Sequence, residues 1–512
     1  MRILLSIVII FFLEPESFAQ GGFRARCFSQ GAITHVTKDV FEISPDKYFA
    51  GGISIDGNGV YALTLMGLNG SGQIQWTKKY GTTNLQYGNH PFNYRTFYKR
   101  DNYFFYAGAM IDSNQQIIGT LLKLDTIGNI VWQRFYRDSG MDVVPNILTG
   151  STDSGFLLTG FFQSQTTTPT LLIKTDANGN ELWRKIINKA LPNVSDGRAI
   201  LQDSASKKII IAGNQYIGNQ NSAATYNSLI ILDSLGTTLS HINFNATGGL
   251  MDLIQTRDKK FVVTGATRSS DGFNNYYTSY ARKFDVNQPN TPLWTIYGFD
   301  KVSQLNWFSS VMEFSNGDLL LAGSTDSLLE IDNRHNNLSR FVRINHTTGK
   351  VIWKKYYDYA ANDSINNNIL ITCVNPTSDG GWITSLRKTD PGNNPMFYVK
   401  YDSTGCDTTT AYCLNLTGLN KINKENESIT VYPNPTNGLL NLNFPIDFSS
   451  IKKISIRILN IAGAELINKT ITTSDFKEST FKLDLETFEN GIYFLEVFND
   501  GKHITTRKII KE

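Results

Sequence analysis

Residues 171–185 have the sequence LLIKTDANGNELWRK, and this stretch decides the fold. It joins a short apolar run, an Asp, a turn that contains Gly, an apolar residue, Trp and a basic residue. Close copies are LLKLDTIGNIVWQR, which contains Trp132, and FVRINHTTGKVIWKK, which contains Trp353. Looser copies surround Trp76, Trp294 and, with serine in place of the Trp, Ser240. One structural unit is therefore repeated along most of the chain.

A second recurring element precedes each Trp copy. It is a β-prone run that ends in Gly, as in FLLTG at 156–160, and corresponding positions are Gly51, Gly108, Gly160, Gly213, Gly265, Gly323 and Ser385. Each interval has room for four short strands separated by turns. A lone four-stranded sheet cannot bury both of its faces, so such units stack radially. We predict an all-β chain with a seven-bladed β-propeller over residues 20–413, with six or eight blades as alternatives.

Composition and charge narrow the class of protein. Aromatic residues make up 12% of the chain, and 41 Gly and 14 Pro suit a fold with many turns. The formal net charge is only +3, and the basic residues come as scattered pairs rather than on one face, so we expect no nucleic-acid partner. No run after the N-terminal segment approaches the length of a membrane-spanning helix, so the chain is not expected to span a membrane.

The N-terminal segment has two predicted roles. Residues 1–19 resemble a secretory signal peptide, with cleavage between Ala19 and Gln20. The next segment, FRARCFSQG at 23–31, has the aromatic-to-Gly spacing of WQRFYRDSG at 132–140. The seventh repeat lacks its own Trp strand. We therefore predict that the N-terminal segment supplies the outer strand of the last blade and closes the ring, because exposed strand edges need a partner.

The turns of each repeat predict where a ligand binds. The turns between strands one and two, and between strands three and four, are short and contain Asp and Gly, which favour tight turns. In an up-and-down meander both fall at one end of the ring, the short-turn rim. The longer connections, rich in Asn, Ser and Tyr, fall at the opposite end, the long-loop face, where binding residues concentrate. Candidate ligand-binding residues in these loops are Tyr226, Phe273, Tyr276 and Tyr277. The repeated Trp is instead expected to pack between blades.

Cysteines, histidines and acidic residues give no catalytic or metal motif. Cys406 and Cys413 are close in sequence and are the best disulfide candidate, whereas Cys27 and Cys373 either pair or stay unpaired. The sequence around Asp176 partly resembles a calcium loop, but it lacks the distal Glu and occupies the repeated turn. We therefore predict no catalytic residue, metal site or cofactor.

The last part of the chain has a different period. Residues 414–427 are polar and indicate a linker, and 428–512 contain about seven short strands, enough for a small Ig-like β-sandwich. Its motifs are VYPNPTNG (431–438), ILNIAG (458–463), NGIYF (490–494) and a basic end. The region resembles the type A C-terminal sorting domain of the type IX secretion system. The matching residues are Pro433, Asn434, Pro435, Gly438, Gly463, Gly491 and Tyr493.

This resemblance implies a cargo of a bacterium of the Bacteroidota group. The signal peptide would direct export to the periplasm, and the type IX secretion machinery would recognise the C-terminal domain and pass the cargo to the outer cell surface or the medium. The repeats also resemble quinoprotein-like propellers, and NHTTGKVIW at 345–353 is similar to their tryptophan-docking motif. The chain lacks the adjacent Cys pair and the calcium ligands of many of those enzymes, so only the blade geometry is carried over.

The sequence therefore favours a secreted or cell-surface propeller that binds a glycan or a protein. The alternative is a glycan hydrolase or lyase that uses loop carboxylates on a propeller scaffold. Two close carboxylates in the central funnel would favour the enzyme, because glycosidases need such a pair.

Overall fold

The computed structural model describes residues 22–27, 32–83, 85–88, 95–111, 116–163, 169–187, 195–217, 224–270, 275–298, 306–326, 337–357, 359, 369–388, 395–407, 430–443, 454–460, 465–471, 480–499 and 502–512. The chain divides into two compact units, Met1–Leu414 and Asn415–Glu512, which are described separately.

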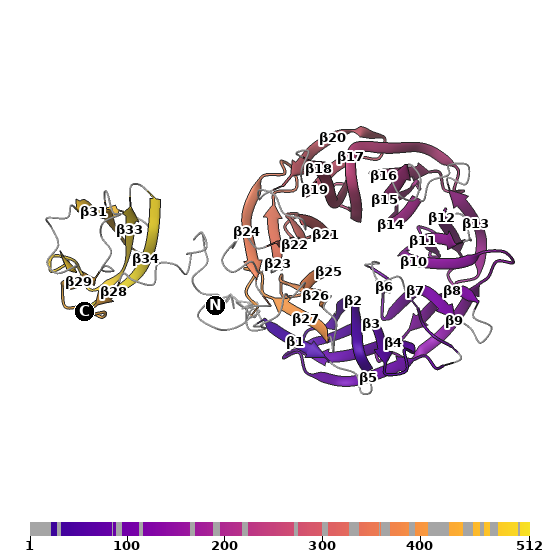
Figure 1. The fold of residues 1–512 in the computed structure, drawn as a ribbon, viewed down its shortest axis with the longest axis horizontal. Coiled ribbons are helices and arrows are strands. Elements are labelled where there is room, and N and C mark those ends of the chain that lie inside the picture. Colours follow the sequence, from indigo (N-terminus) through magenta and orange to yellow (C-terminus); the bar gives the residue numbers. More distant parts are fainter. Residues whose placement is uncertain are drawn as a thin grey trace, which may run out of the picture. The chain divides into compact units, whose positions relative to one another are not determined.

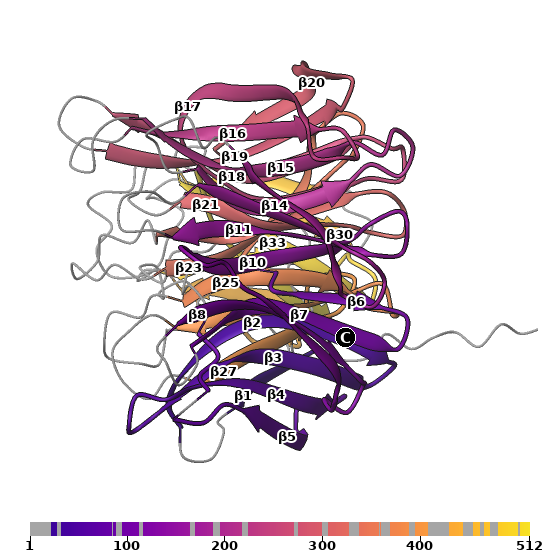
Figure 2. The same cartoon turned by 90° about the vertical axis from the view of Figure 1, so that its right-hand side faces the viewer.

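The first unit is a β-propeller. Its described strands form antiparallel meanders that radiate from a central axis like the blades of a fan (Figure 1), and Figure 2 shows the same strands edge-on. The strand nearest the axis is called the inner strand of its blade, and the fourth strand is the outer one. The prediction of an all-β propeller is confirmed.

The first three blades are separate four-stranded sheets that follow one another in the sequence. Blade 1 contains β2 (Ala32–Ser44), β3 (Lys47–Asp56), β4 (Tyr61–Asn69) and β5 (Ile74–Tyr80). Blade 2 contains β6 (Phe97–Arg100), β7 (Tyr103–Ile111), β8 (Ile117–Leu124) and β9 (Ile130–Tyr136). Blade 3 contains β10 (Asp142–Gly150), β11 (Phe156–Gln163), β12 (Thr170–Thr175) and β13 (Glu181–Ile187).

Blades 4 and 5 share one long strand. β17 (Thr238–Gln255) pairs with β16 in its first part and with β18 in its second, so the two blades form a single seven-stranded sheet. The other strands of blade 4 are β14 (Ser195–Gln202), β15 (Ile209–Ile217) and β16 (Ala224–Leu232). The other strands of blade 5 are β18 (Phe261–Ser270), β19 (Asn275–Asp285) and β20 (Gln288–Tyr297).

Blade 7 is completed by the N-terminal strand. Blade 6 contains β21 (Asn306–Glu313), β22 (Leu319–Asp326), β23 (Asn337–Ile344) and β24 (Val351–Tyr357); blade 7 contains β25 (Ile369–Pro376), β26 (Trp382–Lys388) and β27 (Met396–Tyr401). β1 (Phe23–Cys27) pairs antiparallel with β27 and supplies its fourth strand. Arg24 Nε also donates a hydrogen bond to Asp407 Oδ2 at 2.6 Å. The predicted closure of the ring by the N-terminal segment is confirmed.

The repeated Trp residues hold neighbouring blades together, as predicted. Trp76, Trp132, Trp183 and Trp294 each lie on the Gly of the turn that precedes the outer strand of the next blade. A Cβ added to Gly179 would lie 2.7 Å from the ring of Trp132, and one added to Gly236 would lie 2.9 Å from that of Trp183. Both glycines have φ near +77°, a conformation that side chains disfavour. The hydroxyl of Tyr136, four residues after Trp132, donates to the carbonyl of Gly179 at 2.8 Å.

At Gly160, Gly265 and Gly323 the recurring Gly of the second strand is explained by a β-bulge in the inner strand. The bulge brings a carbonyl so close that a Cβ on Gly160 would lie 2.0 Å from the oxygen of Val144. Bulges recur at this position in blades 4, 5, 6 and 7. The residue opposite the start of the bulge is Gly52 in blade 1, where the sequence had indicated Gly51. In blade 7 it is Leu386, where the sequence had indicated Ser385. The position is set by the pairing register of the strands and not by the spacing along the sequence.

Side chains at the short-turn rim stabilise the turns. Asp176 Oδ1 accepts the N–H groups of Asn178 and Asn180 at 2.9 and 2.8 Å, which fits the prediction of a repeated turn. Basic residues of the third strand pair with an Asp of the first turn. These pairs are Lys174–Asp153 (2.8 Å), Lys283–Asp258 (2.6 Å), Arg343–Asp318 (2.8 Å) and Lys400–Asp379 (2.7 Å).

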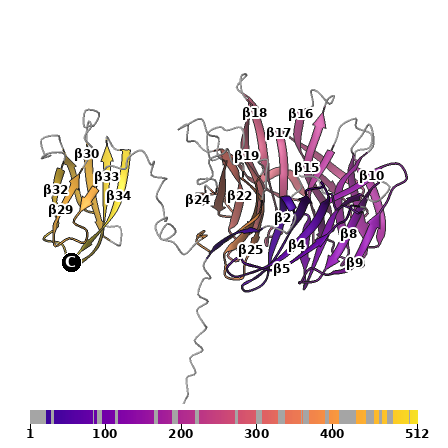
Figure 3. The ribbon, with the colours of Figure 1, turned by 60° about the horizontal axis from the view of Figure 1, so that its bottom comes forward.

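The second unit consists of two sheets around one apolar core. One sheet has the order β28 (Thr430–Tyr432), β29 (Leu439–Asn443) and β32 (Thr480–Asp484). The other has the order β31 (Glu465–Ile471), β30 (Ile454–Asn460), β33 (Gly491–Asn499) and β34 (Lys502–Lys511). Figure 3 shows the strands of this unit side by side. Buried side chains from both sheets, such as Leu442, Ile456 and Leu495, form the core.

Candidate ligand-binding face

Arg95 crosses the axis of the propeller. It precedes the inner strand of blade 2, and its Nη2 lies 2.8 Å from Asp252 Oδ2 on the inner strand of blade 5. The same nitrogen donates to the carbonyl oxygen of Val311 in blade 6 at 2.8 Å. Asp252 is only 1% exposed. A charge-assisted contact therefore ties opposite sides of the ring together across the channel.

Polar residues that follow the inner-strand bulges join successive blades. Asp39 Oδ2 accepts the N–H of Phe97 in blade 2 at 3.1 Å, and Asp252 Oδ2 accepts the N–H of Val311 in blade 6 at 2.8 Å. Burial raises the pKa of Asp39 to about 6, although the Phe97 N–H and the Arg95 charge act in the opposite direction. These axial carboxylates are thus engaged by backbone groups and by Arg95.

The structure corrects the expected position of the ligand-binding candidates. Tyr226, Tyr276 and Tyr277 were expected in loops, but Tyr226 lies in β16 and the other two lie in β19. The hairpins extend further than their polar composition suggests, because residues as far out as Ile217 and Ser270 have cross-strand partners. Phe273 and the side chain of Tyr276 lie outside the described residues.

The shared strand β17 brings two of the candidates into one row. Tyr226 is opposite Thr247, Thr247 is opposite Arg268, and Arg268 is opposite Tyr277. Three strand spacings separate the two tyrosines, which is about 14 Å. Arg268 is exposed and both tyrosines are partly exposed. This row lies near the ends of β15, β16, β18 and β19 and marks the long-loop face at blades 4 and 5.

Arg268 is the residue of this row that the sequence did not single out. The repeat pattern identifies positions common to several blades, and Arg268 has no such counterpart. A candidate list based on aromatic residues also passes over a single basic residue. Only the cross-strand register places its guanidinium beside a tyrosine.

The open alternative for Cys27 and Cys373 is decided by the strand order. Strands β26 and β27 lie between β1, which contains Cys27, and β25, which contains Cys373. A separation of about 14 Å is too large for a disulfide. Both cysteines are buried and unpaired, and burial raises the pKa of Cys27 to about 12. Cys406 is also buried, and its candidate partner Cys413 lies outside the described residues.

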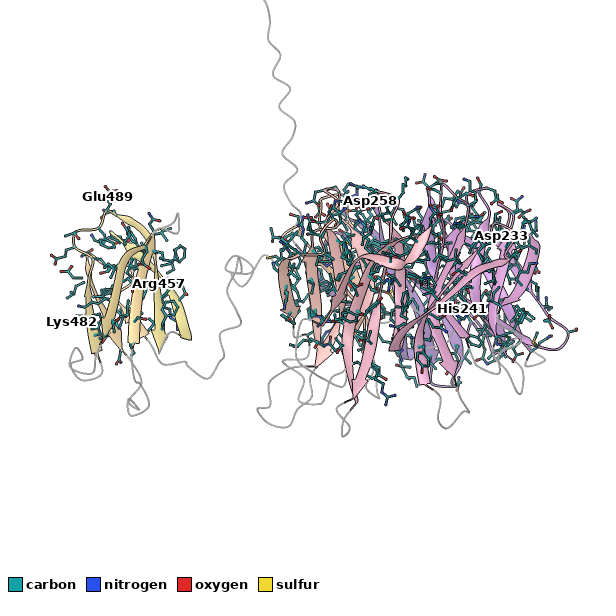
Figure 4. The ribbon with its side chains drawn as sticks, turned by 90° about the horizontal axis from the view of Figure 1, so that it is seen from above. Asp233, His241, Asp258, Arg457, Lys482 and Glu489 are labelled. Atoms are coloured by element: carbon teal, nitrogen blue, oxygen red, sulfur yellow. The ribbon has the colours of Figure 1, made fainter. Side chains whose placement is uncertain are left out.

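Among the described residues no three His, Cys, Asp or Glu side chains form a group that could hold a metal ion. His241 accepts or donates a hydrogen bond with Ser228 Oγ at 2.8 Å, and burial lowers its pKa. Asp233 and Asp258, labelled in Figure 4, lie at the short-turn rim. The described part of the chain contains no helix that is long and apolar enough to cross a membrane.

Within the second unit, Asn434 of the predicted sorting motif holds the last strand, β34, in place. Asn434 Nδ2 donates to the carbonyl of Lys508 at 2.7 Å, and Asn434 Oδ1 accepts the N–H of Ile510 at 2.8 Å. Tyr493 is buried, and its hydroxyl donates to the carbonyl of Glu489 at 2.7 Å. The remaining motif residues are Pro433 and Pro435, which are exposed, Gly438, Gly491 at the start of β33, and Gly463, which lies outside the described residues.

Residues 430–512 match a family described as the secretion system C-terminal sorting domain. The match supports export of this chain as a cargo of the type IX secretion system, to the outer cell surface or the medium. It covers the second unit and not the propeller. No curated protein matches the chain. The expected likeness to quinoprotein propellers has no counterpart among these matches.

Similar solved structures are distant. A protein of unknown function from Bacteroides caccae is 14% identical, with 56% of this chain and 87% of that chain covered and a TM-score of 0.33. An ACO/RPE65 chimera is 8% identical, with 73% and 94% covered and a TM-score of 0.39. Sucrose-6-phosphate hydrolase from Lactobacillus gasseri is 11% identical, with 71% and 85% covered and a TM-score of 0.30. Likenesses at this level transfer no activity to this chain.

Proposed function

We propose that this chain is an exported β-propeller that binds a glycan or a protein through its long-loop face. The sorting-domain match over residues 430–512 supports the export. The row that joins Tyr226, Arg268 and Tyr277 on one continuous sheet supports the binding and is the observation that carries it. Aromatic rings with polar tips, held on rigid strands, are well suited to contact a sugar or a partner protein.

The proposed export pathway includes signal-peptide cleavage, recognition of the sorting domain and formation of a disulfide. A signal peptide over 1–19 is removed between Ala19 and Gln20, as in cargo of Bacteroidota. The type IX machinery then recognises the sorting domain, 428–512, which follows a linker at 414–427. Cys406 and Cys413 form a disulfide where the propeller ends, in the oxidising environment outside the cytoplasm. The intact mass of the secreted protein, with and without reductant, tests the cleavage site and the disulfide together.

Binding is proposed in preference to glycan hydrolysis because of what the axial carboxylates contact. A glycosidase needs one carboxyl group that protonates the leaving oxygen and one that acts as nucleophile or base. Asp39 and Asp252 instead accept backbone N–H groups of neighbouring blades, and Arg95 lies against Asp252. Their oxygen atoms therefore take part in contacts that join the blades of the ring.

A glycan array probed with the full chain tests the proposal. Tyr277→Ala and Tyr276→Ala should each reduce retention several-fold. Tyr103→Ala provides the control, because Tyr103 is also a solvent-exposed tyrosine but begins β7 at the short-turn rim, and it should bind like the wild type. Equal retention of all three variants would contradict the assigned face. Release of free sugars from an incubated polysaccharide would favour the hydrolase or lyase.

A further inference from the structure

We propose that one face of the second unit is the surface on which a protein of the secretion machinery docks. This surface is an apolar patch on the outer side of the four-stranded sheet, and its residues are Leu459, Ile492, Phe494 and Ile510. The docking protein offers an apolar surface bordered by an acidic side chain. The inference rests on the proposed export of the chain and locates the contact that export needs.

The patch lies on the side of β33 that faces away from the core. Tyr493 and Leu495 belong to the apolar core between the two sheets. Successive residues of a strand point to opposite faces, so Ile492 and Phe494 point away from that core. Their side chains remain 39% and 36% exposed. The core therefore explains every second residue of this strand, but not why the residues between them are large and apolar.

The pairing register extends the patch over three neighbouring strands. Phe494 is directly opposite Leu459 on β30, and Ile492 is directly opposite Ile510 on β34. Directly opposed residues point to the same face of a sheet, with their Cβ atoms about 5 Å apart. Leu459 and Ile510 are partly buried. The four side chains thus form one apolar surface on a regular sheet.

The other half of the same face is polar, and its charges are paired. Arg457 and Glu496 are directly opposite each other on β30 and β33, and Arg457 Nη2 lies 2.6 Å from Glu496 Oε2. Figure 4 labels Arg457 on this sheet. An exposed apolar patch with a polar border is typical of a surface that contacts another protein.

The segments that resemble sorting motifs meet at this patch. Its residues come from ILNIAG (Leu459), NGIYF (Ile492 and Phe494) and the basic end (Ile510). Asn434, in VYPNPTNG, supports the margin of the patch: its Nδ2 donates to the carbonyl of Lys508 at 2.7 Å, and its Oδ1 accepts the N–H of Ile510 at 2.8 Å. Residues 430–512 match a secretion sorting domain. A surface to which all these segments contribute is therefore assigned to the secretion machinery.

A cation at the margin of the patch indicates the charge of the partner. Lys508 is exposed and lies directly opposite Phe494, on the side away from Leu459. Opposite charges across a contact favour the correct partner, whereas like charges disfavour binding. The complementary protein therefore places an acidic side chain beside its apolar surface.

Export of the full chain by a Bacteroidota host with a working type IX system tests the inference. Ile492→Thr and Phe494→Thr together keep β-prone residues but remove most of the exposed apolar surface. The exported fraction should fall about tenfold or more, because truncation of central aromatic residues commonly has this effect on an interface. Leu439→Thr is the matched control and should be exported like the wild type, because Leu439 is 44% exposed but begins β29 in the other sheet.

Reversal of the marginal charge is a second test. Lys508→Glu should reduce export, whereas Lys482→Glu, the same change at an exposed position of β32 in the other sheet, should not. Limited proteolysis of each purified full-length variant checks that the second unit is folded. Normal export of the folded double variant, or equal effects of the two charge reversals, would overturn the proposed surface.

A photo-cross-linking side chain at position 494 identifies the partner without truncation of the patch. In the exporting host it should form an adduct with a protein of the secretion machinery, and the same group at position 439 should not. An adduct within the same chain, an adduct with a second copy of the chain, or no adduct would each refute the assignment.

Deletion of residues 430–512 separates this inference from the export on which it rests. If the shortened chain stays in the periplasm while the double variant is exported normally, the patch is refuted and export through the sorting domain stands. If the shortened chain is exported like the full chain, both are refuted.

Discussion

The contact of Arg95 with Asp252 makes a quantitative prediction about the ring. Arg95→Met keeps the length of the side chain but removes its charge and leaves Asp252 buried without its cation. Removal of one partner of a buried ion pair typically costs about 3–5 kcal/mol. The Arg95 side chain is 31% exposed and that of Asp252 only 1%, so water can compensate in part. We expect the variant to lose about 2–3 kcal/mol of unfolding free energy, at or just below the lower limit of that range.

A double-mutant cycle measures this contact in the full chain. All seven Trp residues precede residue 414, so Trp fluorescence during urea unfolding reports on the propeller alone. Asp252→Asn keeps an acceptor for the N–H of Val311, and the double variant should be more stable than the sum of the single effects by about 1 kcal/mol or more. Arg134→Met, which removes the exposed hydrogen bond from this blade 2 residue to Asn180 of blade 3, should stay within about 1 kcal/mol of the wild type. Additive effects of the two axial changes would refute the clamp.

Three further predictions concern the closure, the blade contacts and acid stability. Deletion of residues 20–31 should lower the melting temperature by many degrees, because it removes the outer strand of blade 7; an unchanged melt would dismiss this closure. Gly236→Ala should be clearly destabilising because φ is +78° and the ring of Trp183 would be 2.9 Å from the new Cβ, whereas Gly57→Ala, with open space around it, should leave the melt unchanged. Burial raises the pKa of Asp153, but hydrogen bonds from its buried lysine and from Ser151 outweigh this and lower it to about 2, below its unfolded value near 4. The contribution of Asp153 to stability is therefore full above about pH 4 and is lost as the pH falls toward 2, so melting curves of wild type and Asp153→Asn should converge over that range.

Much of the fold could be predicted because each repeat carries its own docking signals. The Trp of each unit is visible in the sequence and was expected to pack between blades, and Trp132 does so by lying against Gly179 in the turn of the next blade. The closing strand was predictable from the spacing after Phe23 together with the missing Trp strand of the seventh repeat. The bulge in the inner strands could not be predicted, because a bulge changes the pairing register and no particular residue type marks it in the sequence. The recurring Gly was recognised as a marker, but its cause, a carbonyl in the place of a Cβ, is visible only in the structure.

The candidate site was less predictable, and its residues explain why. Tyr226 and Tyr277 were selected as aromatic residues in polar segments, but the sequence separates them by 51 positions and gives no reason for them to share a sheet. The unbroken strand β17 brings them together, and its length follows from the absence of a turn between blades 4 and 5. Arg95 and Arg268 were missed for a related reason. Each acts through a partner that only the register or the closure of the ring brings close.

The closure of the ring also constrains how the chain is processed. β1 begins at Phe23, and the residues that hold it, Lys400 and Asp407, lie nearly 400 positions later. A cleavage beyond Phe23 would remove part of the strand that pairs with β27 and expose its edge. Cleavage between Ala19 and Gln20 would leave β1 intact. Because the last pairing needs both ends of the propeller, the ring can close only after the chain up to Asp407 is present.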